Sequence, residues 1–451
     1  MSLFLQIFVI GCFVVVVVAL FLEKTDYLTY SIAATLAAVT MIFILTPEEI
    51  NLEDLFVAID WPVIFFLISL FTIVAILDEA KIFQEVARRL TTKFKSNTRK
   101  FFWIMCLTST ITAAFIEDIS VAIIFIPMII STSEKMKINP APILLGMTTC
   151  INLAATLTPF GSAQNLLIAS QFGLSTAWFF VNLGPFFILG TFTTLLLLDR
   201  FILKKHIKDI WVPHCVENDE PIDEAHFEEH ELVILEDPID KNLFIRNILA
   251  LVLFIVVLMI IPSVLFVGLF GMVVFVFLNP RKTETGKKRP DVSHFLKKVD
   301  FKLVFFFICL FTLVYCLEVV GILKILEDIV VGLAPSSIFL LCVFVLVITS
   351  LFSGLIDNIP VTVLFIPIIQ ALVTSGYAAT PLLIAFILGI NLGGNFLPQG
   401  SAPDMMTLEL SKKYCVDDMS YKRLFKVGGL FALYHILLGI GYLAFMIFFF
   451  Y

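Results

Sequence analysis

The chain consists mainly of apolar runs of about 18–22 residues, the length that an α-helix needs to cross a bilayer. Of its 451 residues, 60% are apolar and 15% are charged, against about 45–50% and 25% in soluble domains. A water-soluble core of this size could not bury so much apolar surface. We therefore predict an all-α polytopic protein of the cell membrane, with the lipid bilayer as a partner. The net charge of −7 and the scattered basic residues disfavour nucleic acid.

Two of the apolar stretches, 101–133 and 336–376, carry acids near their centres. We interpret each as a re-entrant hairpin whose arms are too short to cross alone, which leaves ten full spans. With this topology, 29 of the 30 basic residues fall on one side, which the positive-inside rule identifies as the cytoplasm. Both termini are then outside, the first hairpin enters from the cytoplasm and the second from the exterior. The expected spans are 3–22, 27–46, 61–79, 140–171, 177–198, 243–261, 264–279, 301–320, 380–411 and 427–450.

The two halves of the chain match each other at an offset of 240 residues, which drops to 239 beyond the hairpins. Segment 60–79 has 9 identities in 20 with 300–319, and segment 151–163 has 7 in 13 with 390–402. Each half has an odd number of spans, five, so the second must be inverted relative to the first. We predict a first repeat at 1–198, an acidic cytoplasmic linker at 199–242 and a second repeat at 243–451. Inverted repeats are typical of secondary transporters, whose substrate site lies near the midplane on broken helices.

Four segments interrupt the apolar pattern at mid-membrane depth. Two are hairpin tips, at Glu117-Asp118 and Asp357-Asn358, and two are long helices with Pro and Gly at 156–162 and 395–401. Pro removes a backbone donor and Gly relaxes φ, so both helices should open there. Unwound backbone at this depth is tolerated where it lines a cavity or is buried in protein. Its exposed carbonyl and N–H groups attract ions.

The polar residues of these four segments are the candidate site. An acid in the bilayer interior costs about 2.5–3.5 kcal/mol, so Glu117 and Asp357 are functional hypotheses by default, whereas Asp118 and Asn358 could simply cap helices. The other polar residues could serve only as interhelical hydrogen bonds. The candidates for ion or proton binding are Glu117, Asp118, Asp357, Asn358 and Asp404. The candidates for lining the cavity are Asn152, Thr156, Thr158, Gly161, Ser162, Gln164, Asn165, Asn391, Asn395, Gln399, Gly400 and Ser401.

The segments Asp357 to Pro367 (DNIPVTVLFIP) and Leu392 to Ala402 (LGGNFLPQGSA) resemble the ion transporter superfamily. That group includes arsenite efflux permeases, NhaD-type sodium/proton antiporters, the melanosomal P protein and citrate and dicarboxylate symporters. The resemblance extends from about residue 30 to the C-terminus. It implies a mobile domain that moves like an elevator against a scaffold, usually in a homodimer. It also implies two ion sites, one at the first tip with 156–165 and one at the second tip with 395–404.

The tips here are charged, whereas those of dicarboxylate carriers typically read Ser-Asn-Thr. Such acids should repel a di- or tricarboxylate unless they are protonated or paired with a cation, and no Lys or Arg is expected at that depth. We therefore expect cation/proton antiport or proton-coupled, arsenite-type efflux of a small ion or solute, with sodium or a proton as coupling ion. The alternative is a sodium-coupled di- or tricarboxylate (or other anion) symporter.

No nucleophile–base set is evident, so we expect no enzyme activity, no cofactor and no bound metal. The nearest metal candidate, His214-Cys215 with His226 and His230 spaced i,i+4, lies in the acidic linker, which we interpret as a solvated connection. The basic segment 81–100 has apolar residues at near-helical spacing, which predicts an amphipathic helix on the inner membrane surface.

Overall fold

The computed structural model describes residues 2–21, 26–94, 97–116, 118–204, 239–261, 263–282, 288–333, 337–355, 358–416 and 418–450. Apart from a two-stranded hairpin of β1 (Arg281–Lys282) and β2 (Lys288–Arg289), all regular elements of these residues are helices. The prediction of an all-α polytopic fold is therefore confirmed. The tip acids Glu117 and Asp357, and the linker residues from His214 to His230, lie outside the described residues.

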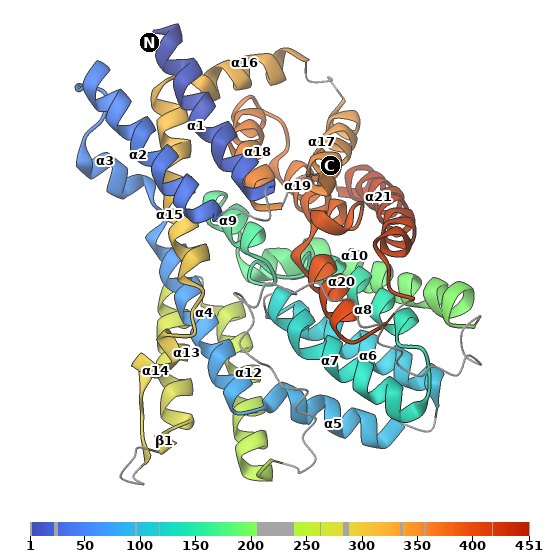
Figure 1. Ribbon diagram of the computed structural model, residues 1–451. Helices are drawn as coiled ribbons and strands as arrows, with labels where there is room; N and C mark the ends of the chain where they lie inside the picture. The colour runs from blue at the N-terminus through green and yellow to red at the C-terminus, as the bar shows by residue number, and fades with distance from the viewer. Residues whose placement is uncertain are drawn as a thin grey trace.

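One group of helices forms a column at the left of Figure 1. Within it α4 packs against α13, and α15 packs against α2 and α1. Gly268 of α13 allows the close approach of α4, because a Cβ there would stand 2.7 Å from the Phe66 ring. The column consists of α1 (Leu3–Phe21), α2 (Tyr27–Leu45), α4 (Trp61–Glu79), α12 (Lys241–Ile260), α13 (Val264–Leu278) and α15 (Phe301–Val319), with the short helices α3 (Leu52–Ala58) and α14 (Val292–Leu296).

The remaining long helices form a second group, here called the body, which lies mostly to the right of the column (Figure 1). Its two halves pack on each other through α19 and α8, α20 and α7, and α18 and α9. From the first half come α6 (Thr98–Ala113), α7 (Asp118–Met136), α8 (Ala141–Ala154), α9 (Ala163–Gln171) and α10 (Thr176–Leu198), which continues as a π-helical turn, η1 (Asp199–Leu203). From the second half come α17 (Ile338–Leu355), α18 (Asn358–Thr374), α19 (Ala379–Gly393), the 3-10 turn η3 (Pro398–Gly400), α20 (Ala402–Lys413) and α21 (Tyr421–Phe450).

Two helices connect the column to the body at opposite ends of the molecule. Helix α5 (Ile82–Phe94) follows α4 at the bottom of Figure 1, and α16 (Ile322–Leu333) follows α15 at the top. The chain turns into each connector through a residue with left-handed backbone, Lys81 with φ 54° and Gly321 with φ 80°. The helix expected within 81–100 is thus present as α5.

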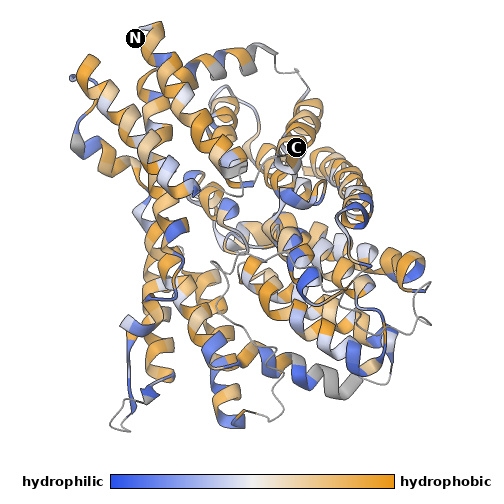
Figure 2. Ribbon diagram, in the orientation of Figure 1, coloured by the Kyte–Doolittle hydropathy of each residue, from blue (hydrophilic) through white to orange (hydrophobic). Residues whose placement is uncertain are grey.

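Eight helices of the described residues are long and apolar enough to cross a membrane. Figure 2 shows hydrophobic residues along the long helices and hydrophilic ones gathered on α5, α14 and the β-hairpin. Two of the eight, α7 with 19 residues and α17 with 18, are hairpin arms, so by length and composition these two arms are not too short to cross alone, contrary to the expectation from the sequence. The eight are α2, α4, α7, α10 with η1, α12, α15, α17 and α21.

The elements recur in the same order in the two halves. Helices α4 and α15 begin at Trp61 and Phe301, and the connectors α5 and α16 begin at Ile82 and Ile322, in each case 240 residues apart. The domain boundaries, the ten spans and the opposite orientation of the halves in a bilayer stay predictions.

Candidate functional site

Both long helices of the body open at the predicted places. In the first half the helix is interrupted between Ala154 and Ala163, and in the second between Gly393 and Ala402, apart from the single turn η3. Pro159 and Pro398 lie inside these breaks, where a missing N–H donor costs no helical hydrogen bond. The two broken helices expected from the sequence are therefore confirmed.

Each break lies against the end of the first hairpin arm in its own half. The Thr158 hydroxyl donates a hydrogen bond to the Ala114 carbonyl, just beyond α6. A Cβ on Gly161 would stand 3.1 Å from that same oxygen, and a Cβ on Gly400 would stand 3.0 Å from the Gly354 carbonyl oxygen near the end of α17. These glycines are needed because the breaks approach the hairpin backbones so closely.

Asp404 is the centre of a group of polar side chains that we call the acidic cluster. Its carboxylate accepts hydrogen bonds from the Thr148 hydroxyl and, at 3.4 Å, from Asn152 Nδ2. The same Asn152 nitrogen lies 2.8 Å from Asn395 Oδ1 and 3.0 Å from Ser401 Oγ. Ser401 caps α20 by accepting from the Asp404 backbone N–H at 3.3 Å. All five side chains are at most 4% exposed.

A second group, the neutral cluster, surrounds Asn391. Its Nδ2 donates to Asn165 Oδ1 at 2.8 Å, and its Oδ1 accepts from Gln164 Nε2 at 3.2 Å and from Ser162 Oγ at 3.4 Å. Asn165 also donates to the Thr158 carbonyl at 3.2 Å, which ties the first break together. Every polar atom that contacts Asn391 here is thus uncharged.

The two clusters are related by the repeat. Asn152 and Asn391 stand 239 residues apart, and each reaches into the break of the opposite half. Asp404 corresponds at the same offset to Asn165. The halves therefore build two related polar sites, and a carboxyl group is present in one of them only.

Charge at the acidic cluster has no fixed counter-ion among the described residues. Asp404 is 2% exposed, and no described Lys or Arg forms an ion pair with it. A buried carboxylate without a partner is costly, so the group must be protonated or paired with a cation. An amide NH2 has two protons, so Asn152 Nδ2 cannot satisfy three oxygens at once. The oxygens of Asn395, Ser401 and Asp404 thus all lie around the Asn152 amide nitrogen, which leaves at least one of them without a proton from it.

The structure leaves some predicted residues outside both clusters. Thr156 donates to the Leu153 carbonyl in the last turn of α8. Asp118 and Asn358 begin α7 and α18, and the Asn358 side chain accepts from Ser353. Gln399 is exposed, and its Oε1 accepts from the Tyr421 hydroxyl at 2.6 Å.

Thr148 is the residue of the acidic cluster that sequence reasoning missed. It stands four residues before Asn152 on α8, so the two side chains share one face of the helix. That spacing was the available signal, but no Pro, Gly or acid marks the position.

Among known proteins, a family model described as "Citrate transporter" (CitMHS) matches residues 13–390. A "46 kDa membrane protein" of Mycobacterium leprae is 27% identical over 392 residues, 84% of this chain and 86% of that one. The silicon efflux transporter LSI3 of Oryza sativa subsp. japonica is 24% identical over 165 residues, 37% of this chain and 33% of that one.

One solved structure is similar over nearly the whole chain. The YdaH transporter of Alcanivorax borkumensis, described as having an unusual topology, superposes with a TM-score of 0.61 at 12% identity. The match covers 99% of this chain and 98% of that one. At this level of identity the likeness concerns the fold alone.

Proposed function

We propose how this chain, which belongs to the citrate transporter family and is a membrane transporter, couples transport to an ion gradient. In this proposal it is a secondary active transporter that exchanges a cation for protons or exports a weakly charged, arsenite-like solute in exchange for protons. Asp404 binds the coupling ion, sodium or a proton. The observation that carries the proposal is the buried Asp404 carboxylate at the point where oxygens of Asn395 and Ser401 converge on Asn152 Nδ2.

The coupling follows from the cost of burying charge. Asp404 has no basic partner among the described residues. Its site can therefore move through the membrane with Asp404 as a protonated acid or as a carboxylate with a bound cation, but not as an unpaired charge. Binding of a sodium ion therefore requires the loss of a proton, and binding of a proton requires the loss of the sodium ion. If the site faces each side in turn, this competition exchanges one ion for the other.

The nature of the transported solute is argued from the same charges. A di- or tricarboxylate next to Asp404 would be repelled unless cations were bound first. The relative named for silicon efflux favours export. The description of the family as citrate transporters favours the alternative, a sodium-coupled di- or tricarboxylate symporter.

We propose that access alternates by movement of the body against the column, with α5 and α16 as connecting arms (Figure 1). A cavity of about 340 Å³ separates α1 from the second hairpin, and residues such as Phe13, Phe352 and Pro360 line it. Between α4 and the first break, Leu67 and Leu166 line a cavity of about 10 Å³. In this movement the apolar contacts slide, while the hydrogen bonds from Ser170 to the Asp60 carboxylate and from Thr176 to the Leu258 carbonyl would have to break.

Cross-linking tests the proposed movement. The double variant Leu67→Cys, Leu166→Cys joins column to body, and mercury-mediated linkage should stop transport until a reductant is added, while each single variant keeps transporting. Transport at the unlinked rate by fully cross-linked protein would argue against an elevator.

Ion exchange in proteoliposomes tests the proposed role of Asp404. With a pH dye inside, an outward sodium gradient should draw protons in, and Asp404→Asn should abolish this signal. The matched control is Glu409→Gln on the same helix, α20, where the side chain is exposed and exchange should be unchanged. Equal exchange by Asp404→Asn and the wild type would refute the role of Asp404. Citrate- or succinate-dependent sodium entry without proton counterflow would support the symporter instead.

A further inference from the structure

The β-hairpin that follows α13 carries an unusual charge pattern. Its register pairs Arg281 with Arg289 and Lys282 with Lys288, so both cross-strand pairs consist of two cations. Like charges directly opposite each other destabilise a strand pair. A two-stranded hairpin is also marginally stable by itself, so this one needs an external source of stability.

The base of the hairpin is fixed at the end of the column helices. Arg281 begins β1 only three residues after the last residue of the apolar helix α13, Leu278. Between them, Asn279 exchanges two side-chain hydrogen bonds with Asn247 of α12, at 2.8 and 3.0 Å. Because α12 is a candidate span and Asn247 lies near its start, the hairpin is held where the column leaves the membrane.

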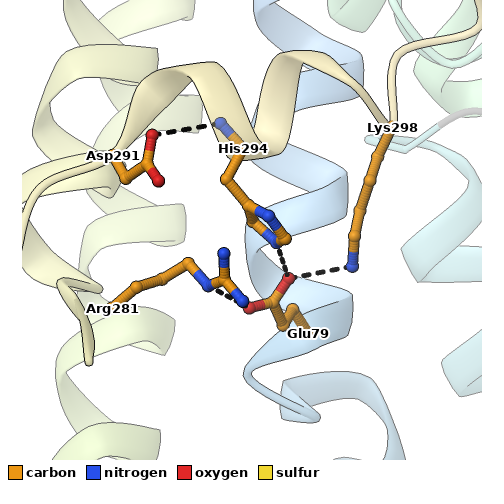
Figure 3. Close-up of polar contacts among 5 residues, drawn as sticks. All are labelled: Glu79, Arg281, Asp291, His294 and Lys298. Carbon is orange, nitrogen blue, oxygen red and sulfur yellow. Dashed lines mark hydrogen bonds and ion pairs between the residues drawn. The ribbon is translucent and has the colours of Figure 1, made fainter. Parts of the chain in front are cut away.

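One nearby carboxylate serves three basic groups. Glu79, the last residue of α4, lies 3.3 Å from Arg281 Nε, 2.7 Å from His294 Nε2 and 2.8 Å from Lys298 Nζ (Figure 3). A single acid cannot balance this set. Lys288 and Arg289 are exposed, and neither forms an ion pair with any other residue that the structure describes. Among the described residues, the charges of Lys288 and Arg289 are therefore not compensated by an acid.

We propose that the four basic residues of β1 and β2, Arg281, Lys282, Lys288 and Arg289, bind anionic phospholipid headgroups of the adjacent leaflet. Headgroup phosphates supply the missing counter-charge, and basic residues next to a membrane helix are attracted to an anionic surface. The short tether to α13 confines the hairpin to the membrane surface, which favours lipid over a soluble acidic partner. Through Arg281 and Glu79 the bound lipid anchors the junction between α4 and the connector α5.

A thermal-shift experiment on the purified full-length protein tests the proposal. Dioleoylphosphatidylglycerol is added in neutral detergent micelles, with dioleoylphosphatidylcholine as the zwitterionic comparison, and bound lipid is counted by native mass spectrometry. The wild type should gain thermal stability and retain lipid with phosphatidylglycerol only, and less so at high salt. The triple variant Lys282→Gln, Lys288→Gln, Arg289→Gln should bind it roughly tenfold more weakly or worse.

Without anionic lipid, the hairpin variant should be at least as stable as the wild type. Removing the like-charge pairs should leave its melting temperature equal to or above that of the wild type, which separates lost binding from lost folding. The matched control, Lys412→Gln, Lys413→Gln, Lys422→Gln, removes the same charge from another exposed surface and should keep the phosphatidylglycerol effect. Equal loss in both triple variants, equal binding of the two lipids, or an unchanged effect in the hairpin variant would overturn the proposal. None of these readouts depends on what the protein transports.

Discussion

Replacing Gly393 with alanine tests how closely the second broken helix must pack. Gly393 is the last residue of α19, and a Cβ there would stand 2.3 Å from the Ser350 carbonyl oxygen and 2.8 Å from the Ser350 Cα. Both atoms belong to the backbone of α17, so no side-chain rotation can relieve the clash. The two helices would have to separate, and the site would move with them, because Asn395 follows two residues later.

The expected loss is at the upper end of the range of about 1–3 kcal/mol that overpacked cores show, since backbone must shift. The assay is the apparent melting temperature of the detergent-purified protein by size-exclusion chromatography after heating. Gly441→Ala on α21 is the matched control, because a Cβ there meets nothing within 4 Å, and it should melt at or above the wild-type temperature. If Gly393→Ala melts together with Gly441→Ala, the close approach of α17 and α19 is not as described.

Two further predictions concern the connectors. Gly321→Ala should lower the free energy of unfolding by about 1–2 kcal/mol, measured as a lower melting temperature, because φ at Gly321 is 80°. A Cβ would meet nothing within 4 Å at either Gly321 or Gly332, so Gly332→Ala within α16 is the control and should not lower stability. In α5, hydrogen bonds from Arg88 and then Arg89 hold the pKa of the Glu85 carboxyl below its usual value. Because its pKa is lowered in the folded state, the ionised Glu85 carboxyl stabilises the fold above the unfolded pKa of about 4.5. This stabilisation is lost as the pH falls through the folded pKa. Acidification from pH 7 to pH 3 should therefore lower the melting temperature of the wild type more than that of Glu85→Gln. An equal fall in the melting temperature of both proteins would argue against the ion pairs of Glu85 with Arg88 and Arg89.

The breaks in the long helices could be predicted because their causes are local. Pro159 and Pro398 remove backbone donors at fixed positions, and the recurrence of the surrounding residues at 239 marks both breaks as parts of one repeat. Length and hydropathy likewise sufficed for the membrane helices. The lengths of the hairpin arms did not follow, because α7 continues to Met136, beyond the apolar stretch.

The contacts between the halves could not be predicted from these patterns. That Asn152 reaches Asn395 and Ser401, rather than residues of its own half, depends on how α8 and α19 pack in three dimensions. Gln399 looked equivalent to its neighbours in sequence, yet its side chain leaves the break and bonds Tyr421. The β-hairpin lies in a short polar loop without alternating apolar residues, so the sequence pattern did not predict its strands.

Proton release on addition of sodium shows whether Asp404 exchanges a proton for a cation. Purified protein in weakly buffered detergent solution at neutral pH is mixed with sodium chloride, and released protons are recorded with a pH indicator dye, with choline chloride as the salt control. If Asp404 holds either a proton or a cation, sodium should release protons from the wild type and from Glu409→Gln but not from Asp404→Asn. The same release from Asp404→Asn as from the wild type, or none from the wild type at any pH between about 6 and 9, would contradict the proposed exchange at this carboxyl group.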